Sequence, residues 1–158
     1  MCRHNRAVRS IRYDGNARMP GAKPQPEIVF YDGYCGLCHW AVKFALKHDR
    51  SGTAVRFAPL QGKTFLLRVP ADQRAGLPDS IAVQTHDGSL LVRSAAFIHV
   101  LRQLGGGWKV MAAVAARIPR PLRDVMYDFI AHIRYRVLSR RDDLCPVVPP
   151  DLRSRFDP

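Results

Sequence analysis

The stretch of sequence that decides the fold is Glu27-Ile-Val-Phe-Tyr-Asp-Gly-Tyr-Cys-Gly-Leu-Cys38, in which an apolar and β-branched run leads into two cysteines. The run from Glu27 to Asp32, ended by Gly33, is typical of a buried strand. A cysteine pair directly after a strand lies where a following helix would begin. The strand and the cysteine pair are therefore expected to form one structural unit.

The residues after the cysteines change to helical spacing. Apolar positions recur from Leu37 to His48, which predicts a helix over residues 39–49 that Ser51-Gly52 stops. Residues 55–60 then alternate like a second strand, and Pro59 marks either its end or an edge position. The sequence thus predicts a β-α-β unit with the cysteines at the N-terminus of its helix.

The middle of the chain predicts a short helix and a hairpin. The helix is expected around residues 65–68. Two apolar runs, at residues 80–85 and 90–92, are separated by a segment that contains Asp87-Gly88, and an Asp-Gly pair in this setting favours a hairpin. The third and fourth strands are therefore expected to be antiparallel.

The last third of the chain predicts helices and a proline-rich tail. Ser94 is expected to cap a helix that Gly105-Gly106-Gly107 ends, and residues 108–118 are weakly helical. Residues 122–137 form the longest amphipathic segment, and residues 145–150 are expected to lie extended because of their prolines. Most of the apolar stripe of the long helix is expected to be core: Leu122, Val125, Met126, Phe129, Ile130, Ile133 and Val137.

The composition limits the classes to which the protein can belong. The chain has 158 residues, 47% hydrophobic and 9% aromatic, which is enough for a sizeable core, and no internal repeat or second domain is found. The longest weakly charged apolar run, residues 110–116, falls far short of the roughly 20 residues that a membrane-spanning helix needs. One folded domain over residues 27–158, without a membrane-spanning segment, is therefore expected.

Residues 1–26 are basic and show no regular periodicity, so we expect a disordered leader. They have no apolar central region, and a secretory signal peptide is therefore not expected. An alternative is that translation starts at Met19, which would leave a short leader before the first strand.

Cys35 and Cys38 are expected to lie at the N-terminus of the first helix, where unpaired backbone N–H groups and the helix dipole stabilise a thiolate. Cys35 is then expected to be the attacking sulfur. Cys38, one helical turn further on, can attack the resulting mixed disulfide and release the reduced substrate. The spacing of the pair therefore favours thiol-disulfide exchange.

Two alternatives use the same cysteines to hold a metal or a haem. Tetrahedral zinc commonly takes two separated ligand pairs, whereas this chain has one Cys-x-x-Cys, to which Cys145 and a histidine could add ligands. Cys35-Gly-Leu-Cys-His39 also matches the pattern for covalent haem attachment. Because the pair lies next to a β-α-β pattern and no export signal precedes it, the redox interpretation is favoured.

Asp32-Gly-Tyr-Cys-Gly-Leu-Cys38 resembles the Asp-x-x-Cys-x-x-Cys signature of the DCC family of thiol-disulfide oxidoreductases, which is regarded as thioredoxin-like. The resemblance implies an α/β fold with a mixed sheet flanked by helices and a helical C-terminal extension. It also implies that Cys35 and Cys38 are the redox pair. The similarity covers residues 27–157 and continues through Arg56-Phe-Ala-Pro-Leu-Gln61, Asp79-Ser80, Ser94-Ala-Ala96, Leu104-Gly-Gly106, Cys145-Pro146 and Arg155-Phe156.

Asp32 matches the aspartate of that signature and is carried over as the third candidate site residue. It could cap the helix, brace the turn or assist proton transfer when the thiols form. The chain departs from thioredoxin at another position, because Ser80 stands at the nearest equivalent of the cis-proline opposite the dithiol and Pro78 lies two residues earlier. The substrate-docking surface of thioredoxin is therefore not carried over.

The remaining cysteines and histidines receive no catalytic role. Cys145 is expected to be a buried structural thiol, with a third redox sulfur as the alternative, and Cys2 belongs to the leader. The histidines share no metal-ligand spacing and are expected to be core, surface or turn residues: His48, His86, His99 and His132.

Charge is the last feature that the sequence offers. The 25 Lys and Arg residues against 13 Asp and Glu give a formal charge of +12, which attracts anions of any kind. Arginines are spread along the chain and interrupted by acids near the C-terminus, so a solvated basic surface is expected rather than a specific nucleic-acid site. The long amphipathic helix is expected to cover the sheet with its apolar stripe. Of the ways in which this helix could bind a membrane, only weak peripheral association with an anionic membrane then remains.

Together these patterns predict a cytoplasmic thiol-disulfide oxidoreductase of the protein-disulfide reductase type, acting through Cys35 and Cys38 with Asp32 beside them. Its expected partners are a disulfide-containing protein or a small thiol. Neither a bound cofactor nor a metal is expected, since the dithiol itself carries two electrons. The competing hypothesis is a redox-inactive thioredoxin-like binding module whose cysteines hold structure or zinc.

Overall fold

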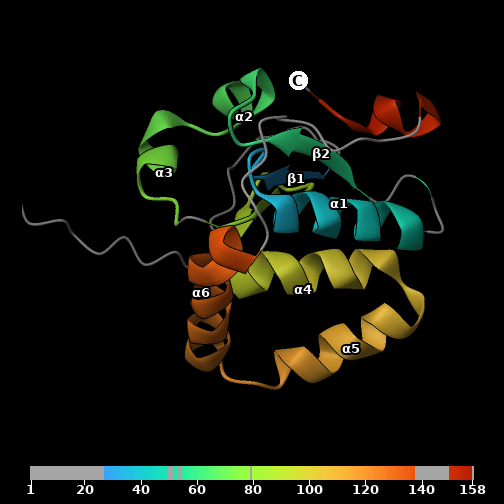
Figure 1. Ribbon diagram of the computed structural model, residues 1–158, viewed down its shortest axis with the longest axis vertical. Coiled ribbons are helices and arrows are strands. Elements are labelled where there is room, and N and C mark those ends of the chain that lie inside the picture. The colour runs from blue at the N-terminus through green and yellow to red at the C-terminus, as the bar shows by residue number, and fades with distance from the viewer. Residues whose placement is uncertain (1–26, 50–51, 53–54, 79, 138–149, 158) are drawn as a thin grey trace, which may run out of the picture.

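A computed structural model of the protein describes residues 27–49, 52, 55–78, 80–137 and 150–157 (Figure 1). In chain order its elements are β1 (Ile28–Tyr31), α1 (Gly36–His48), β2 (Arg56–Pro59), α2 (Lys63–Arg68), α3 (Ala71–Ala75), β3 (Ala82–Gln84), β4 (Leu90–Val92), α4 (Arg93–Leu104), α5 (Gly106–Ala116), α6 (Arg120–Val137) and the 3-10 helix η1 (Pro150–Arg155).

The strands form one mixed sheet in the order β2-β1-β3-β4. β1 is parallel to β2 and antiparallel to β3, and β3 is antiparallel to β4. The β-α-β unit and the hairpin are thus confirmed, and Pro59 lies at the end of an edge strand, where a missing backbone N–H is tolerated. This α/β arrangement, with helices flanking a mixed sheet, is thioredoxin-like.

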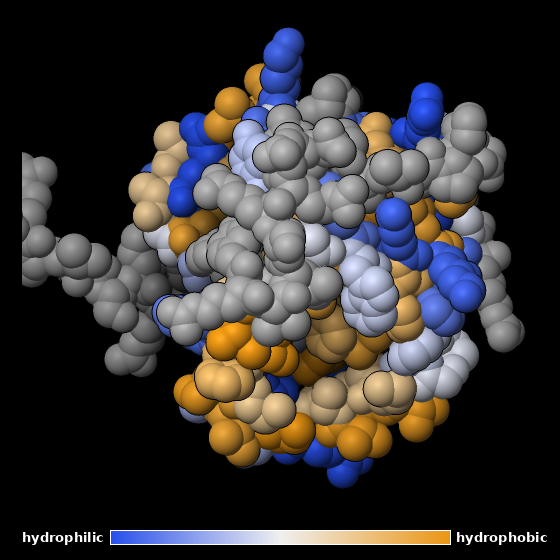
Figure 2. Space-filling view, in the orientation of Figure 1, coloured by the Kyte–Doolittle hydropathy of each residue, from blue (hydrophilic) through white to orange (hydrophobic). Residues whose placement is uncertain are grey.

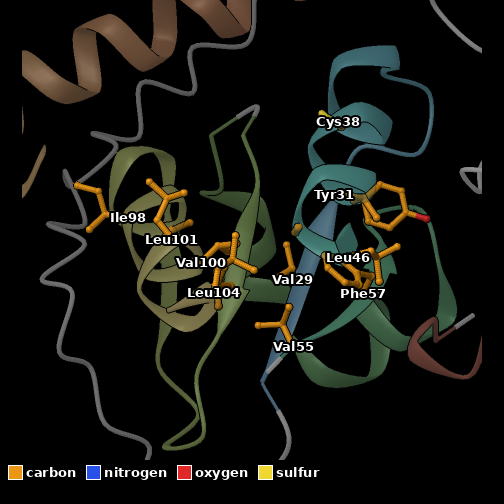
Figure 3. Packing of buried hydrophobic residues seen from close by; sticks show 14 of the residues in the cluster. Val29, Tyr31, Cys38, Leu46, Val55, Phe57, Ile98, Val100, Leu101 and Leu104 are labelled. Carbon is orange, nitrogen blue, oxygen red and sulfur yellow. The ribbon is translucent and has the colours of Figure 1, made fainter. Parts of the chain in front are cut away.

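The core lies on both faces of β1, whose four residues are all buried. Because side chains alternate along a strand, Val29 and Tyr31 pack with α1 and α4, while Ile28 and Phe30 pack on the opposite face. Figure 3 shows Val29 and Tyr31 among the side chains of the first cluster. On the other face, Phe65 of α2 meets Phe30 edge to face, with ring centroids 5.0 Å apart. The hydrophobic clusters on the two faces of the sheet therefore both pack against β1, the strand that leads into the cysteine pair.

Most helices begin or end near the predicted residues, with local differences. α1 begins at Gly36, and α3 was not predicted. Gly105 ends α4 with φ of +69°, a conformation that glycine adopts at low cost, but α5 begins at the very next residue. The glycine triplet therefore ends one helix and begins another.

The prediction that Ser94 caps α4 is wrong. The N-cap is Val92, which makes no side-chain capping hydrogen bond. Ser94 Oγ donates instead to Asp124 Oδ1 of α6, a charge-assisted hydrogen bond that ties the two helices together. The Ser94 hydroxyl therefore links α4 to α6 and does not cap α4.

The prediction that the apolar stripe of α6 lies in the core is also wrong. The helix turns its polar face toward α4 and the start of β3, where its side chains find hydrogen-bond and charge partners, so the apolar face points outward. Ile133 is half-buried, and Val137 lies outside the residues whose side chains are described. The exposed members of the stripe are Leu122, Val125, Met126, Phe129 and Ile130.

The C-terminal tail is joined to the edge of the sheet. Arg155 forms an ion pair with Asp49 at 2.6 Å and donates to the carbonyl of Val55, and the side chains of both charged residues are at most 9% exposed. The backbone N–H of Asp157 donates to the carbonyl of Phe57 at 2.8 Å. The tail thus covers the outer edge of β2, the first strand in the sheet order.

Several predictions fall on residues that the structure does not describe. The leader over residues 1–26 with Cys2, and the segment 138–149 with Cys145, lie outside the described residues. Among the residues that are described, no helix is both long and apolar enough to cross a membrane.

Candidate active site

Cys35 occupies the N-cap position of α1, directly after the turn that follows β1. Its Sγ atom accepts a hydrogen bond from the backbone N–H of Cys38 at 3.3 Å. A negative charge on this sulfur is stabilised by that N–H and by the positive end of the helix dipole. The predicted placement of the pair at the helix N-terminus is therefore what the structure shows.

The two sulfurs differ in their surroundings. Both residues are thiols rather than a disulfide in this structure. Cys35 is 0% exposed, whereas Cys38 is 8% exposed and lines a pocket. A substrate sulfur can therefore reach Cys35 only after neighbouring groups move aside.

Asp32 braces the turn between β1 and α1. Its Oδ1 atom accepts hydrogen bonds from the backbone N–H of Tyr34 and from Nε2 of Gln61, each at 3.0 Å. Asp32 also accepts the backbone N–H of Cys35 through its carbonyl oxygen at 3.2 Å. Of the roles considered for Asp32, bracing is the one seen in these contacts, while the capping position belongs to Cys35.

Gly33 is held from both sides within the same turn. Its backbone N–H donates to Oε1 of Gln61 at 3.1 Å, and its carbonyl accepts from Nε2 of His39 at 2.7 Å. Because a carbonyl only accepts, Nε2 of His39 carries the proton in this contact. The His39 ring is buried and also meets Tyr31 edge to face. His39, considered from the sequence as part of a haem motif, thus positions the turn.

Gln61 was not predicted as a site residue. It follows β2 and bonds to both Asp32 and Gly33, so it joins the ends of the two parallel strands. Parallel neighbours bring their carboxyl ends to one edge of a sheet, which is where α/β folds place functional groups. A polar side chain just after the second strand was the signal that could have identified Gln61.

An apolar pocket of about 340 Å³ lies beside Cys38, between α1, α4 and α5. Aromatic side chains from all three helices line it, among them Trp40, Phe97 and Trp108. Trp40 and Phe97 are also exposed, so the pocket opens to the surface at these residues. The volume is at the lower end of the range in which proteins hold a small ligand or a partner side chain.

The C-terminal tail reaches the strand beneath the cysteine turn. Phe156 stacks on Phe57 with ring centroids 5.5 Å apart and meets Tyr31 edge to face at 6.4 Å. Arg155 places its guanidinium 5.8 Å from the centroid of the same Phe57 ring. These contacts join Arg155 and Phe156 to β2 and, through Tyr31, to the strand that leads into Asp32.

The other residues considered from the sequence lie apart from the cysteines. Nδ1 of His48 hydrogen bonds to the carbonyl of Phe44 within α1, and His99 pairs with the buried Glu27 at 3.0 Å. Ser80 accepts the backbone N–H of Arg93 and so supports the start of α4. Within the part of the chain that the structure describes, no group of three or more His, Cys, Asp and Glu side chains gathers as metal ligands.

A mixed sheet with a cysteine pair at the N-terminus of the helix after one of its two inner strands defines a thioredoxin-like protein with a thiol site. The sequence model of the DCC1-like thiol-disulfide oxidoreductase family matches residues 29–140. The chain belongs to this family and is an oxidoreductase of that class, with thiols or disulfides as substrates.

Two relatives support the same assignment. The chain is 36% identical over 137 residues to "Uncharacterized protein YuxK" of Bacillus subtilis (strain 168), covering 83% of this chain and 93% of the relative. It is 32% identical over 120 residues to a DCC family protein of Arabidopsis thaliana whose name describes it as chloroplastic, covering 73% and 66% of the two chains. No solved structure matches the chain.

Proposed function

We propose that the protein reduces disulfides through Cys35 and Cys38, with Cys35 as the attacking sulfur. The observation that carries this proposal is the hydrogen bond from the backbone N–H of Cys38 to Sγ of Cys35 at the N-terminus of α1. A thiolate is the reactive form of cysteine, and this N–H and the helix dipole favour the thiolate of Cys35.

The reaction proceeds in two exchanges. The Cys35 thiolate attacks one sulfur of the substrate disulfide, so that a mixed disulfide forms and the first substrate thiolate leaves and takes up a proton. Cys38 then loses its proton and attacks Sγ of Cys35, which forms the Cys35–Cys38 disulfide and releases the second substrate thiolate. Two electrons pass from the dithiol to the substrate, and an external thiol reductant restores the dithiol.

Asp32 acts in this proposal as a positioning residue. Its contacts with Tyr34 and Gln61 hold the turn that presents Cys35 at the helix terminus. If Asp32 also took up the proton of a thiol, Asp32→Asn would shift the pH profile of the exchange rate. We expect Asp32→Asn to lower the stability while the shape of that profile stays as in the wild type.

The pocket beside Cys38 favours the binding of substrates that carry an apolar group next to the disulfide. Its lining is almost wholly apolar and includes Trp40, Phe97 and Trp108, so a charged group would lose its hydration there without gaining a partner. Reduction fits a reducing compartment such as the cytoplasm, because the direction of exchange follows the potential of the surroundings. We therefore place the protein there, with a protein disulfide or a small disulfide as its substrate.

The test uses purified full-length protein, a chromogenic aromatic disulfide and a dithiol as the electron donor. We expect Cys35→Ser to reduce turnover to the uncatalysed rate. Cys38→Ser is expected to stop turnover after the first exchange and to trap a mixed disulfide on Cys35, which mass spectrometry of the intact protein and its peptides identifies. Cys145→Ser is the matched control and is expected to keep the wild-type rate.

Two results would contradict this proposal. Trapping of substrate on Cys38 in Cys35→Ser would reverse the assignment of the attacking sulfur. Wild-type turnover in both single variants would show that the cysteine pair is not the active site. A titration in glutathione buffers adds an independent measure, because a reversible two-electron Cys35–Cys38 couple is expected and its midpoint gives the direction of exchange.

A further inference from the structure

α5 and α6 expose apolar side chains that a globular domain normally buries. On α6, Val125 is 66% exposed and Phe129 65%, and on α5, Val110 and Val114 are each 65% exposed. Figure 2 shows apolar side chains gathered along the lower edge of the molecule, where Figure 1 places α5. Exposed apolar side chains that gather in this way mark interaction surfaces. We define the outer apolar surface by Val110, Val114, Leu122, Val125, Met126 and Phe129.

The orientation of α6 is fixed by its polar face. Asp124 accepts the hydroxyl of Ser94, and Asp128 pairs with Arg93 at 3.1 Å, both on α4. Between these two acids, the Tyr127 hydroxyl accepts the backbone N–H of Ile81 at 3.0 Å. Residues at these spacings lie on one face of a helix, so the contacts turn the opposite, apolar face away from the body.

The charges around the outer apolar surface are cationic. The chain carries no Asp or Glu between Asp87 and Asp124, and both acids of α6 that follow point toward α4. Lys109 and Arg117 are exposed on and just after α5. Arg117 follows Val114 by three positions and therefore lies on the same helical face. Apolar side chains and cations thus share this surface, while Asp124 and the half-exposed Asp128 are paired with Ser94 and Arg93 of α4.

We propose that the outer apolar surface binds an anionic phospholipid bilayer. In this arrangement the apolar side chains enter the boundary between headgroups and acyl chains, and Lys109 and Arg117 meet the lipid phosphates. The contact is peripheral, because no helix among the described residues is long and apolar enough to cross the bilayer. The inference does not depend on the thiol chemistry, and its test needs no turnover.

A second copy of the chain fits this surface less well. In a two-fold contact the same patch of both copies forms the interface, so Arg117 and Lys109 of both copies would be gathered in it. The chain has a formal charge of +12, which adds repulsion between copies at long range. The same charges attract an anionic bilayer, which is why charge complementarity selects lipid over self-association.

The test is co-sedimentation of the full-length protein with two kinds of vesicle. Vesicles of phosphatidylcholine with phosphatidylglycerol are expected to bind the protein, and binding should weaken as salt is added. Vesicles of phosphatidylcholine alone are expected to bind it much less. Size measurement of the protein without lipid, over a range of concentrations, runs alongside and is expected to show no dimer.

Two pairs of variants separate the charge from the apolar part. Arg117→Glu is expected to lower the partition coefficient by at least about fivefold, since each basic residue near the surface contributes about 1 kcal/mol. Arg102→Glu, an exposed position on α4 with the same change in charge, is its control. Val125→Ser with Phe129→Ser is expected to lower binding without changing charge, and Leu67→Ser, 86% exposed on α2, is the control for that pair.

Three results would overturn the proposal. Equal binding to both vesicle types would remove the role of anionic lipid. Equal loss in Arg102→Glu and Arg117→Glu would reduce the effect to the overall charge of the chain. A dimer that Val125→Ser with Phe129→Ser dissociates would assign the surface to a second copy instead. In each case turnover by Cys35 and Cys38 is measured separately. A negative result in the lipid-binding test therefore does not contradict the proposed function.

Discussion

The turn between β1 and α1 buries its polar groups, whereas α6 exposes its apolar ones. In the turn, Asp32 is 6% exposed and its carboxylate accepts hydrogen bonds from Tyr34 and Gln61. On α6, Asp124 likewise faces the body and bonds to Ser94, but Phe129 on the other face is 65% exposed. In both regions the polar side chains lie where a hydrogen-bond partner is available, whereas the apolar side chains on the outer face of α6 lie largely in solvent. The position of a side chain here follows its partners rather than its polarity alone.

The largest effect is expected from removing a buried aromatic ring of the strand β2 next to the turn, which is compared with removing an exposed ring of α6. Phe57 is 1% exposed beneath the tail, so Phe57→Ala should lower the free energy of unfolding by about 3–5 kcal/mol. Phe129→Ala on α6 should change it by less than about 0.5 kcal/mol, because its ring is already in solvent. Denaturant unfolding measures both values.

If Phe57→Ala does not fold, Phe57→Leu keeps part of the ring volume and should give a smaller loss that can be measured. A loss for Phe129→Ala as large as that for the Phe57 variant would break the comparison, because it would mean that the outer face of α6 is packed.

A smaller effect is expected from Gln61→Ala. The substitution removes the side chain that bonds to both Asp32 and Gly33, which should cost about 1–2 kcal/mol of stability because two bonded groups in the turn lose a partner. Lys63→Ala, exposed on the neighbouring helix α2, is the control and should be nearly neutral. Denaturant midpoints that agree between the two variants would show that the turn does not rely on Gln61.

Tyr127→Phe sharpens the other side of the comparison. It removes the hydroxyl that accepts the backbone N–H of Ile81, and a net loss of about 1 kcal/mol is expected. Amide hydrogen exchange at Ile81 should become faster in the same variant, which locates the effect. Unchanged exchange at Ile81 would show that the polar face of α6 is not held against the start of β3.

The smallest effect is expected at the exposed hairpin turn. The hydroxyl of Thr85 donates to Asp87, and this hydrogen bond, together with the backbone N–H of Ser89, lowers the pKa of the Asp87 carboxyl. A lowered pKa in the folded state gives stability that is present above the unfolded pKa and is lost as the pH falls through the folded pKa. Thr85→Val should raise the Asp87 pKa toward its ordinary value in an NMR titration, with little change in stability at neutral pH.

Local patterns predicted most of the fold, because strands and helices follow from the spacing of apolar residues. The spacing of α6 showed which of its residues share a face, but it carried no information on what that face meets. Asp124, Tyr127 and Asp128 form an equally continuous polar face, and their partners on α4 and just before β3 are set by tertiary structure. A stripe such as that of α6 therefore predicts a helix without predicting its orientation.

The candidate site likewise combines residues that local patterns predict with residues whose contacts depend on tertiary structure. Cys35 and Cys38 were predicted from their spacing and the strand before them, since both signals are local. Gln61 needed the pairing of β1 with β2, because only parallel neighbours bring it to the turn. Arg155 and Phe156 were noted only as part of a resemblance, and their contacts with Asp49 and Tyr31 depend on how the chain closes on itself.

The ion pair between Arg155 and Asp49 joins residues 106 positions apart in the chain. During synthesis the N-terminal part emerges first, so β1, the cysteine turn, α1 and β2 leave the ribosome long before the residues that cover the edge of β2 exist. Contacts between such distant residues form late. The nascent chain therefore carries both thiols before Phe156 can pack on Tyr31, and the surroundings of the dithiol are completed by residues that are translated long after the cysteines.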